Sequence, residues 1–359
     1  MKTGISIYPG VDNTSEENLR LLDSAAHLGI SRLFISCNTN LKNFDDSKEI
    51  FSKVVQRARQ LNFEIILDMT DSLLSLFSMR TLSLSAFQFL GIHTLRMPYD
   101  YNAKEIASLS HNTQGIRIGL HASSVSGRFL GELLDAKADF DNIDAFHSAY
   151  AHEGTGLSES TLVRKTAMLH KAGIHVSAFI PSQERRRSPL RRGMPTLEMH
   201  RDISLSLAAR HMAAVGLDSV FIGDSLPSKD ELTTITSIKP NLIVLRAQLL
   251  QEDSIQNELL HQTYTARLDE ARDAVRAVES KQYIQEQSLV IEPTEPHVRP
   301  YGSVTIDNKN YGEYMGELQI LKRPLPADPR VNIAAHIPEE EQFLINYIIP
   351  GKKFSFLIQ

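Results

Sequence analysis

The chain has 359 residues, of which 42% are hydrophobic and 23% are charged, and its formal net charge is −5 at pH 7. Such proportions are typical of a globular protein with room for two domains. A weakly acidic chain is not expected to present the broad basic surface that binds nucleic acid. Cys37 is the only cysteine, which excludes an intrachain disulfide framework and a cluster of thiolate metal ligands.

The apolar runs of the sequence are short. The first one, in MKTGISIYPG, is interrupted by Pro9 and Gly10 too early for a signal peptide. No run approaches the roughly 20 apolar residues that a membrane span needs. We therefore expect a cytoplasmic protein that binds neither membranes nor nucleic acid, while the formation of a homo-oligomer stays open.

Short apolar runs alternate with longer amphipathic ones through the first two thirds of the chain. The first amphipathic run begins with Thr14 and Glu17, spaced as a capping box, and ends at Gly29. The helix after the seventh apolar run is expected from Leu197 to Gly216. The eight expected strands are 4–8, 32–36, 63–69, 94–99, 116–122, 142–147, 175–181 and 219–223.

Eight consecutive strand-then-helix units predict right-handed crossovers and a parallel sheet. A closed (β/α)8 TIM barrel over residues 1–240 accounts for that count. The alternative is an open, doubly wound sheet, but no glycine-rich dinucleotide fingerprint follows the first strand. The barrel is therefore the favoured α/β architecture.

The rhythm changes after residue 240. Residues 241–290 are expected to connect two domains through one strand-like run and a polar helical stretch over 254–281, and EPTEP then indicates an extended linker. Residues 291–359 predict a small all-β domain, most naturally a barrel. Its expected strands are 303–306, 314–322, 331–337, 342–348 and 353–358.

Polar residues follow or end most of the expected barrel strands, which is where (β/α)8 enzymes carry their reacting groups. Many convergent polar groups indicate a pocket for a polyhydroxylated substrate. The candidates are Ser6, Tyr8, Ser36, Asn38, Asp68, Arg96, Tyr99, Asp100, His121, Ser123, His147, Tyr150, Ser182, Gln183 and Asp224.

Several of these candidates also have a purely structural interpretation. Asp68 is typical of a helix cap or turn, and Asp224 of an Asx turn, as well as of a reacting carboxyl group. Arg96, inside a strand, either binds an anionic substrate or pairs with a barrel carboxylate such as Asp68. His121 and His147 have no third ligand at metal-site spacing, so neither a metal nor a cofactor is expected.

Five arginines lie within Arg185–Arg192, between the seventh strand and the next helix. This basic loop either is solvated or binds an anion, and the bidentate guanidinium fork suits a phosphate. Glu317 stands apart from the barrel candidates. As a carboxylate inside the strand-like run GELQI, it interrupts an otherwise apolar pattern and is a further candidate.

Several motifs, in order along nearly the whole chain, resemble those of the bacterial 6-phospho-N-acetylmuramidases, glycoside hydrolase family 170. They are GISIYPG, FIPSQ, GMPTLEMHR, VFIGDS and VTIDN…YMGELQILK…LPADPRVN. The resemblance implies a TIM barrel followed by a cyclophilin-like β-barrel. It also implies cytoplasmic hydrolysis of the β-1,4 bond in 6-phosphorylated N-acetylmuramyl–N-acetylglucosamine during cell-wall recycling, with Arg187 and Arg96 as ligands of the substrate's anionic groups.

The chain departs from the family pattern at three strand tips. RMPYD stands where RLDYG is usual, so Pro98 replaces an aspartate, and HASS places His121 where an asparagine is usual. In HSAYAHEGTGLS, Ser148 and His152 replace an asparagine and an arginine. These changes bear on specificity or activity more than on the fold.

We therefore expect a glycosidase of this family, or a diverged paralogue acting on a related phosphorylated amino-sugar glycoside. Asp68 and Asp224 are the expected catalytic carboxyl groups, and Asp100 or Glu153 are alternatives because of Pro98. A second hypothesis is a non-catalytic sugar-phosphate-binding protein. An aldolase or isomerase is disfavoured because no lysine ends a barrel strand.

The expected substrate-binding residues are Tyr8, Ser36, Arg96, His121, His147, Tyr150, Gln183, Arg187 and Glu317.

Overall fold

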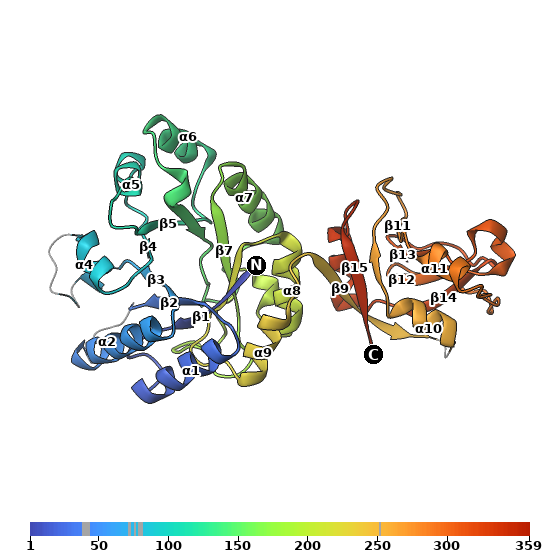
Figure 1. Ribbon diagram of the computed structural model, residues 1–359, viewed down its shortest axis with the longest axis horizontal. Coiled ribbons are helices and arrows are strands. Elements are labelled where there is room, and N and C mark those ends of the chain that lie inside the picture. The colour runs from blue at the N-terminus through green and yellow to red at the C-terminus, as the bar shows by residue number, and fades with distance from the viewer. Residues whose placement is uncertain (38–43, 71–72, 75–76, 78–81, 251–252) are drawn as a thin grey trace. The chain divides into compact units, whose positions relative to one another are not determined.

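The computed structural model describes residues 1–37, 44–70, 73–74, 77, 82–250 and 253–359 (Figure 1). The chain divides into two compact units. The first comprises Met1–Met212 and Gly216–Ile238, and the second comprises Ala213–Val215 and Lys239–Gln359. Among the described residues, no helix combines the length and the apolar character that crossing a membrane requires.

The first unit contains a closed barrel of eight parallel strands, in which each strand pairs with the next along the chain and β8 pairs with β1. The expected TIM barrel is thus confirmed. The strands are β1 (Lys2–Ile7), β2 (Arg32–Ser36), β3 (Glu64–Asp68), β4 (Thr94–Arg96), β5 (Arg117–His121), β6 (Ile143–Phe146), β7 (His175–Ile180) and β8 (Ser219–Ile222).

Helices connect the strands and lie outside them in Figure 1. The first helix begins at the expected capping box, in which the Thr14 hydroxyl accepts a hydrogen bond from the Glu17 backbone N–H. The helices are α1 (Ser15–His27), α2 (Phe44–Gln60), α4 (Leu84–Phe89), α5 (Ala103–Ser110), α6 (Gly127–Asp135), α7 (Glu159–Lys171), α8 (Leu205–Val215) and α9 (Lys229–Ser237).

The helix expected from Leu197 to Gly216 was placed too early. Only a short 3-10 turn, Glu198–His200, precedes α8. The buried Arg201 side chain explains the irregular stretch, because it donates hydrogen bonds to the Glu198 carboxylate and to backbone oxygens of Tyr150 and Gly193. Those interactions tie the segment to the barrel loops instead of to a continuous helix.

An aromatic layer fills the barrel interior. Phe34, Phe146, Phe179 and Phe221 pack together with Ile66, and none of the five is more than 3% exposed. The Phe34 and Phe179 rings meet edge to face, with centroids 5.0 Å apart and an interplanar angle of 74°, a favourable geometry for aromatic pairs. The barrel interior is therefore a packed core at this level.

The second unit is built on a seven-stranded mixed sheet with strand order β10-β15-β9-β14-β12-β13-β11. The fold class expected for this part, a small β domain after the barrel, is confirmed, whereas its likeness to cyclophilin stays a prediction. Its strands are β9 (Leu242–Leu249), β10 (Thr263–Thr265), β11 (Ala274–Arg276), β12 (Ser303–Asp307), β13 (Leu318–Leu321), β14 (Val331–His336) and β15 (Lys353–Ile358).

Residues 241–290, expected to be a connecting segment, contribute three strands to this sheet. The expected helix over 254–281 is instead α10 (Ser254–Leu260), then β10 and β11, then α11 (Ser280–Glu286). The buried ring of Tyr264 explains the change, because its hydroxyl donates to the Leu259 carbonyl while β10 pairs with β15. Tertiary pairing here overrides a polar, helix-like sequence.

The strand expected at 342–348 is also wrong. Glu339–Tyr347 forms a 3-10 helix with Glu339, Glu340 and Glu341 in its first turn. Acidic side chains are favoured at a helix start. Glu341 is fully buried and accepts a hydrogen bond of 2.9 Å from the Arg246 backbone N–H on β9.

The barrel interior generates a stability prediction. A Cβ atom on Gly4 of β1 would lie 2.3 Å from the Phe221 ring, so Gly4→Ala should lower the free energy of unfolding by about 1–3 kcal/mol through overpacking. Gly131 in α6 has nothing within 4 Å of the same position, and Gly131→Ala should raise it by up to about 1 kcal/mol. Urea denaturation measures both, and effects of the same sign would contradict this account of the core.

Candidate functional site

A cavity of about 470 Å³ opens at the carboxyl ends of the barrel strands, and its volume lies within the range of about 300–1,000 Å³ common for small-molecule sites. The Phe34 and Phe179 rings of the aromatic layer contribute to its lining. It is lined by Tyr8, Phe34, Ser36, Asp68, Met69, Thr70, Arg96, Pro98, Tyr99, His121, Ser148, Ala149, Tyr150, Ala151, Phe179, Arg187 and Met194.

Asp68, at the end of β3, is held in one orientation. Its Oδ1 accepts a hydrogen bond of 2.7 Å from Arg96 Nε, and its Oδ2 accepts one of 2.9 Å from the Ser36 hydroxyl. The Arg96 guanidinium also lies over the Phe34 ring, 4.8 Å from the centroid. Of the two interpretations of Arg96, the structure shows the pair with Asp68, and it places that pair at the cavity.

Arg187 is the member of the arginine loop that lines the cavity. Its guanidinium stacks 4.3 Å above the Tyr8 ring, and its buried Nε has no hydrogen-bond partner in the described part of the chain. Its Nη1 contacts only the Met194 sulfur, at 4.0 Å. Against its burial, hydrogen bonds from Ser188 and Ser225 and the charge of Arg187 lower the pKa of Asp12, but Arg187 forms no ion pair within 4.0 Å among the described residues. A guanidinium in this setting is suited to bind an anionic ligand.

The other arginines of this loop have different surroundings. Arg185 pairs with Glu17 at 2.7 Å, and Arg192 pairs with Glu153 at 2.6 Å. Arg186 donates to backbone oxygens of Ser182 and Arg201, while Arg191 is exposed with a φ of 51°. The basic run in the sequence thus yields a single cation at the cavity, in the residues that the structure describes.

Asp224 fixes the loop that carries Arg187. Its carboxylate is fully buried and accepts three backbone N–H groups, from Ser182 at 2.9 Å, Arg187 at 2.8 Å and Met194 at 3.1 Å. Burial raises the pKa of Asp224, and the three N–H donors oppose that rise. Asp224 is not among the described residues that line the cavity.

Tyr8 is positioned by the same region. Its hydroxyl donates a hydrogen bond of 2.6 Å to the Gly223 carbonyl, next to Asp224. Burial raises the pKa of Tyr8 to about 12, against the nearby charge of Arg187. The phenol therefore stays neutral at physiological pH, and its ring supports the guanidinium.

His121, at the end of β5, also lines the cavity. Its ring stacks on Tyr99, with centroids 3.7 Å apart and an interplanar angle of 20°, and Ser148 Oγ lies 3.5 Å from its Nδ1. Burial, together with the charge of Arg96, lowers the pKa of His121 to about 3. His121 is therefore neutral at physiological pH and available for hydrogen bonding.

Other candidates lie both at the cavity and away from it. Tyr150 lines the cavity, whereas the fully buried His147 lies between the Ser123 and Thr166 hydroxyls, at 3.2 and 3.1 Å. Gln183 points to the Ile203 carbonyl, and Glu317 belongs to the second unit, where it pairs with Arg276. Asn38 lies outside the described residues.

Sequence reasoning missed two residues of this region. Asp12, in the β1–α1 connection, accepts hydrogen bonds from the Ser188 backbone N–H and the Ser225 hydroxyl and so also anchors the arginine loop. Glu231 accepts from the Ser182 hydroxyl at 2.7 Å. Glu231 had one readable signal, its spacing from Ser228 as a capping box, but nothing in the sequence pointed to Asp12.

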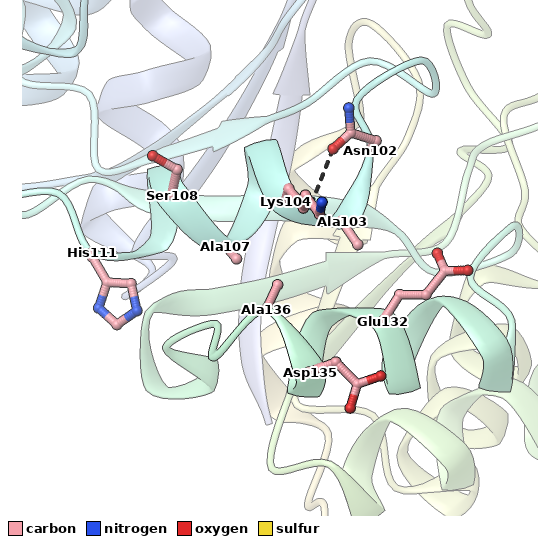
Figure 2. A pocket seen from close by; sticks show the side chains of 9 residues that line it. All are labelled: Asn102, Ala103, Lys104, Ala107, Ser108, His111, Glu132, Asp135 and Ala136. Carbon is pink, nitrogen blue, oxygen red and sulfur yellow. Dashed lines mark hydrogen bonds between the residues drawn. The ribbon is translucent and has the colours of Figure 1, made fainter.

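A larger hollow of about 810 Å³ lies between α5 and α6, on the outside of the barrel (Figure 2). Ala103, Ala107 and Ala136 contribute to its lining, and Figure 2 shows the side chain of Asn102, the N-cap of α5, accepting a hydrogen bond from the Lys104 backbone. Its charged side chains, among them Lys104, Glu132 and Asp135, lie on these outer helices and not at strand ends, where (β/α)8 proteins carry their sites, so we place the candidate site at the barrel mouth. No group of three or more metal-ligating side chains occurs in the described residues.

The fold and this site define a (β/α)8-barrel protein whose mouth presents a cation and an ion-paired carboxylate to one cavity. The chain belongs to the 6-phospho-N-acetylmuramidase family. The model described as "6-phospho-N-acetylmuramidase, N-terminal" matches residues 3–237, and the one described as "6-phospho-N-acetylmuramidase, C-terminal" matches residues 243–357.

Two solved structures resemble this chain over nearly its full length. An uncharacterized protein from B. cereus has 28% sequence identity and a TM-score of 0.88, with 99% of each chain covered. A conserved protein of unknown function from Enterococcus faecalis has 29% identity and a TM-score of 0.72, covering 100% of this chain and 97% of that one. No curated protein gives a significant sequence match.

The buried His147 leads to a prediction about how stability depends on pH. Burial lowers the pKa of His147 from its ordinary 6.5 to about 3, so between these values the unfolded chain binds the extra proton and stability falls as the pH falls. The unfolding free energy of the parent should therefore fall on going from pH 7 to pH 5. In His147→Gln, which has no imidazole at this position, that fall should be smaller by about 2 kcal/mol. Urea titrations at both pH values test this, and an unchanged difference would mean that His147 is protonated in the folded protein.

Proposed function

We propose that the protein hydrolyses the β-1,4 bond of 6-phosphorylated N-acetylmuramyl–N-acetylglucosamine, or of a related phosphorylated amino-sugar glycoside, in the cytoplasm during cell-wall recycling. Membership in the family supports glycosidase-like chemistry. The observation that supports a phosphorylated substrate is Arg187, whose guanidinium lines the cavity, forms no ion pair among the described residues and leaves its Nε without a hydrogen-bond partner there. The proposed reaction requires no cofactor.

In this proposal Arg187 binds the phosphate. Its two-pronged guanidinium matches phosphate oxygens in a bidentate geometry, and stacking on Tyr8 presents it in a fixed plane. Asp224 acts through the loop, because its three backbone hydrogen bonds set where Arg187 stands. We therefore assign Asp224 a positioning role instead of direct contact with the sugar.

Asp68 is the carboxyl group at the reacting bond. Arg96 and Ser36 fix both of its oxygens, an arrangement suited to stabilising positive charge on the sugar ring in an oxocarbenium-like transition state. No second carboxyl group lines the cavity among the described residues. The acetamido oxygen of the substrate then attacks the anomeric carbon while the bond to the leaving oxygen breaks, and a water molecule protonates that oxygen. The hydroxide left from this water opens the resulting oxazolinium at the anomeric carbon and restores the acetamide.

Neutral groups around the cavity contact the hydroxyls of the sugar. Tyr150 and His121 belong to this set. We assign no substrate contact to His147, Gln183 or Glu317, because their polar atoms are engaged elsewhere in the barrel or in the second unit.

Asp68 is the one carboxyl group in the described cavity lining. This observation also favours a second candidate, a protein that binds a sugar phosphate without cleaving it. The carboxylate of Asp68 is paired with Arg96. Such a protein would be stabilised thermally by the phosphosugar in a concentration-dependent way, without product formation. The activity measurement below decides between the two candidates.

The enzyme proposal predicts release of N-acetylglucosamine from the phosphorylated disaccharide by the purified protein. Asp68→Asn should lower kcat/KM by about 10²–10⁴-fold while the thermal shift induced by substrate persists. The matched Asp135→Asn variant removes a carboxyl group on α6 outside the cavity lining and should keep full activity. If the parent protein binds the disaccharide but releases no sugar, the binding-protein candidate replaces the enzyme.

The phosphate assignment predicts a selective effect at Arg187. Arg187→Ala should raise KM for the phosphorylated disaccharide by about 10–100-fold, the value of one charged hydrogen-bonded contact, and should leave turnover of the unphosphorylated disaccharide unchanged. Arg191→Asn removes the same charge from the same loop at a φ of 51° that asparagine tolerates, and it should behave like the parent. Equal turnover of both sugars by the parent protein would rule out phosphate recognition.

A further inference from the structure

A second cavity of about 380 Å³ adjoins the one at the barrel mouth. It lies between the segments that follow β4 and β5, and three residues line both cavities: Pro98, Tyr99 and His121. The two spaces therefore meet at a shared wall. Together they offer more room than one sugar ring needs, since sites of about 300–1,000 Å³ hold whole drug-sized ligands.

The shared wall is an aromatic pair held in place from one side. Tyr99 stacks on His121, and the Tyr99 hydroxyl lies 3.1 Å from Ser148 Oγ, which in turn lies 3.5 Å from His121 Nδ1. Tyr99 nevertheless stays 66% exposed. A large aromatic side chain that is both oriented and exposed offers a flat apolar surface to a ligand.

The second cavity differs in chemistry from the arginine end of the first. Its described lining contains no charged side chain, and aromatic and aliphatic groups such as Tyr101, Ile106 and Phe129 dominate it. An anion would gain nothing from such a surface and would lose its hydration. The ligand that fits is an uncharged group with one apolar face.

The barrel geometry separates these two chemistries. In the closed order of eight strands, β4 and β5 stand opposite β8 and β1. Tyr8, which follows β1, and Arg187, which stacks on it, belong to the β8–β1 side. The shared aromatic wall belongs to the β4–β5 side. Asp68, at the end of β3, lies between the two sides. A ligand spanning the mouth would thus have an anionic end and a neutral end.

We propose that Tyr99 and the second cavity form the subsite for the leaving, uncharged N-acetylated sugar, with the Tyr99 ring against the apolar face of that sugar. The identity of the two sugars rests on the proposed function. The phosphorylated sugar then lies toward Arg187, and the bond to be cleaved lies near Asp68. This orientation makes Tyr99 a specificity determinant for the part of the substrate that carries no phosphate.

The test compares the phosphorylated disaccharide with its phosphorylated monosaccharide, N-acetylmuramic acid 6-phosphate. Both are titrated calorimetrically into Asp68→Asn protein, in which kcat/KM is expected to be about 10²–10⁴-fold lower. Adding Tyr99→Ala should weaken disaccharide binding about tenfold, as expected for losing one aromatic contact surface, and leave monosaccharide binding unchanged. Tyr99→Phe keeps the ring and should bind both ligands like the parent, whereas Arg187→Ala should weaken both.

A second variant tests the cavity itself. Ser124 is an exposed residue in its lining, and Ser124→Leu fills the space. It should also weaken the disaccharide selectively. Because the Ser124 hydroxyl donates to the His121 carbonyl, Ser124→Ala serves as the control that removes this hydrogen bond without filling the cavity, and it should bind the disaccharide like the parent. If Tyr99→Ala and Ser124→Leu leave disaccharide affinity unchanged, or weaken the monosaccharide equally, the subsite assignment is wrong even when the enzyme is active.

The subsite can also be separated from the proposed function. Binding of methyl β-N-acetylglucosaminide, which has no phosphate, is followed by ligand-observed NMR on the parent protein. Loss of its signal in Tyr99→Ala but not in Arg187→Ala would support the subsite even if no phosphorylated disaccharide is cleaved. Absence of binding to the parent at millimolar glycoside would overturn it.

Discussion

The arrangement of the barrel mouth depends on one buried carboxylate. Asp224 has no exposed surface, and a charged group so placed must be compensated by hydrogen bonds. It takes them from three backbone N–H groups of the loop after β7, and Asp12 adds a further hydrogen bond to the Ser188 backbone N–H. The hydrogen bonds to Asp224 hold the start, the middle and the end of the loop to one carboxylate. Arg187, the one arginine of the loop that lines the cavity, is thereby placed over the Tyr8 ring.

The rest of the mouth is organised by charge separation. On the β3–β4 side Arg96 pairs with Asp68, and burial, together with the charge of Arg96, keeps His121 uncharged. Among the described lining residues, Arg187 is then the positive group that forms no ion pair. The positive charge therefore lies on one side of the cavity, while the Tyr99–His121 pair leaves the other side neutral and aromatic.

The fold was largely readable from the sequence because eight short apolar runs alternate with amphipathic helical patterns that mostly end at a helix-stopping residue. The secondary-structure predictions that were wrong lie where contacts between residues distant in the sequence determine the local structure. Tyr264 places β10 against β15 although its surroundings look helical, and Glu341 is buried by a bond to β9 although its segment looked like a strand. At the site, the sequence pointed to Asp68, Arg96 and the arginine loop, but Asp12 was invisible because its partners are distant in the chain.

The sequence by itself determined the eight-unit barrel, the β-rich second unit and the set of polar strand ends, because periodicity and turn residues act locally. Only the tertiary structure decided which of those polar groups face a common space. It assigned one of five arginines to the cavity, since the other members of that loop are paired, bonded to the backbone or turned to solvent. It also separated Asp68, which lines the cavity, from Asp224, which supports it, because burial and hydrogen-bond partners are properties of the folded chain.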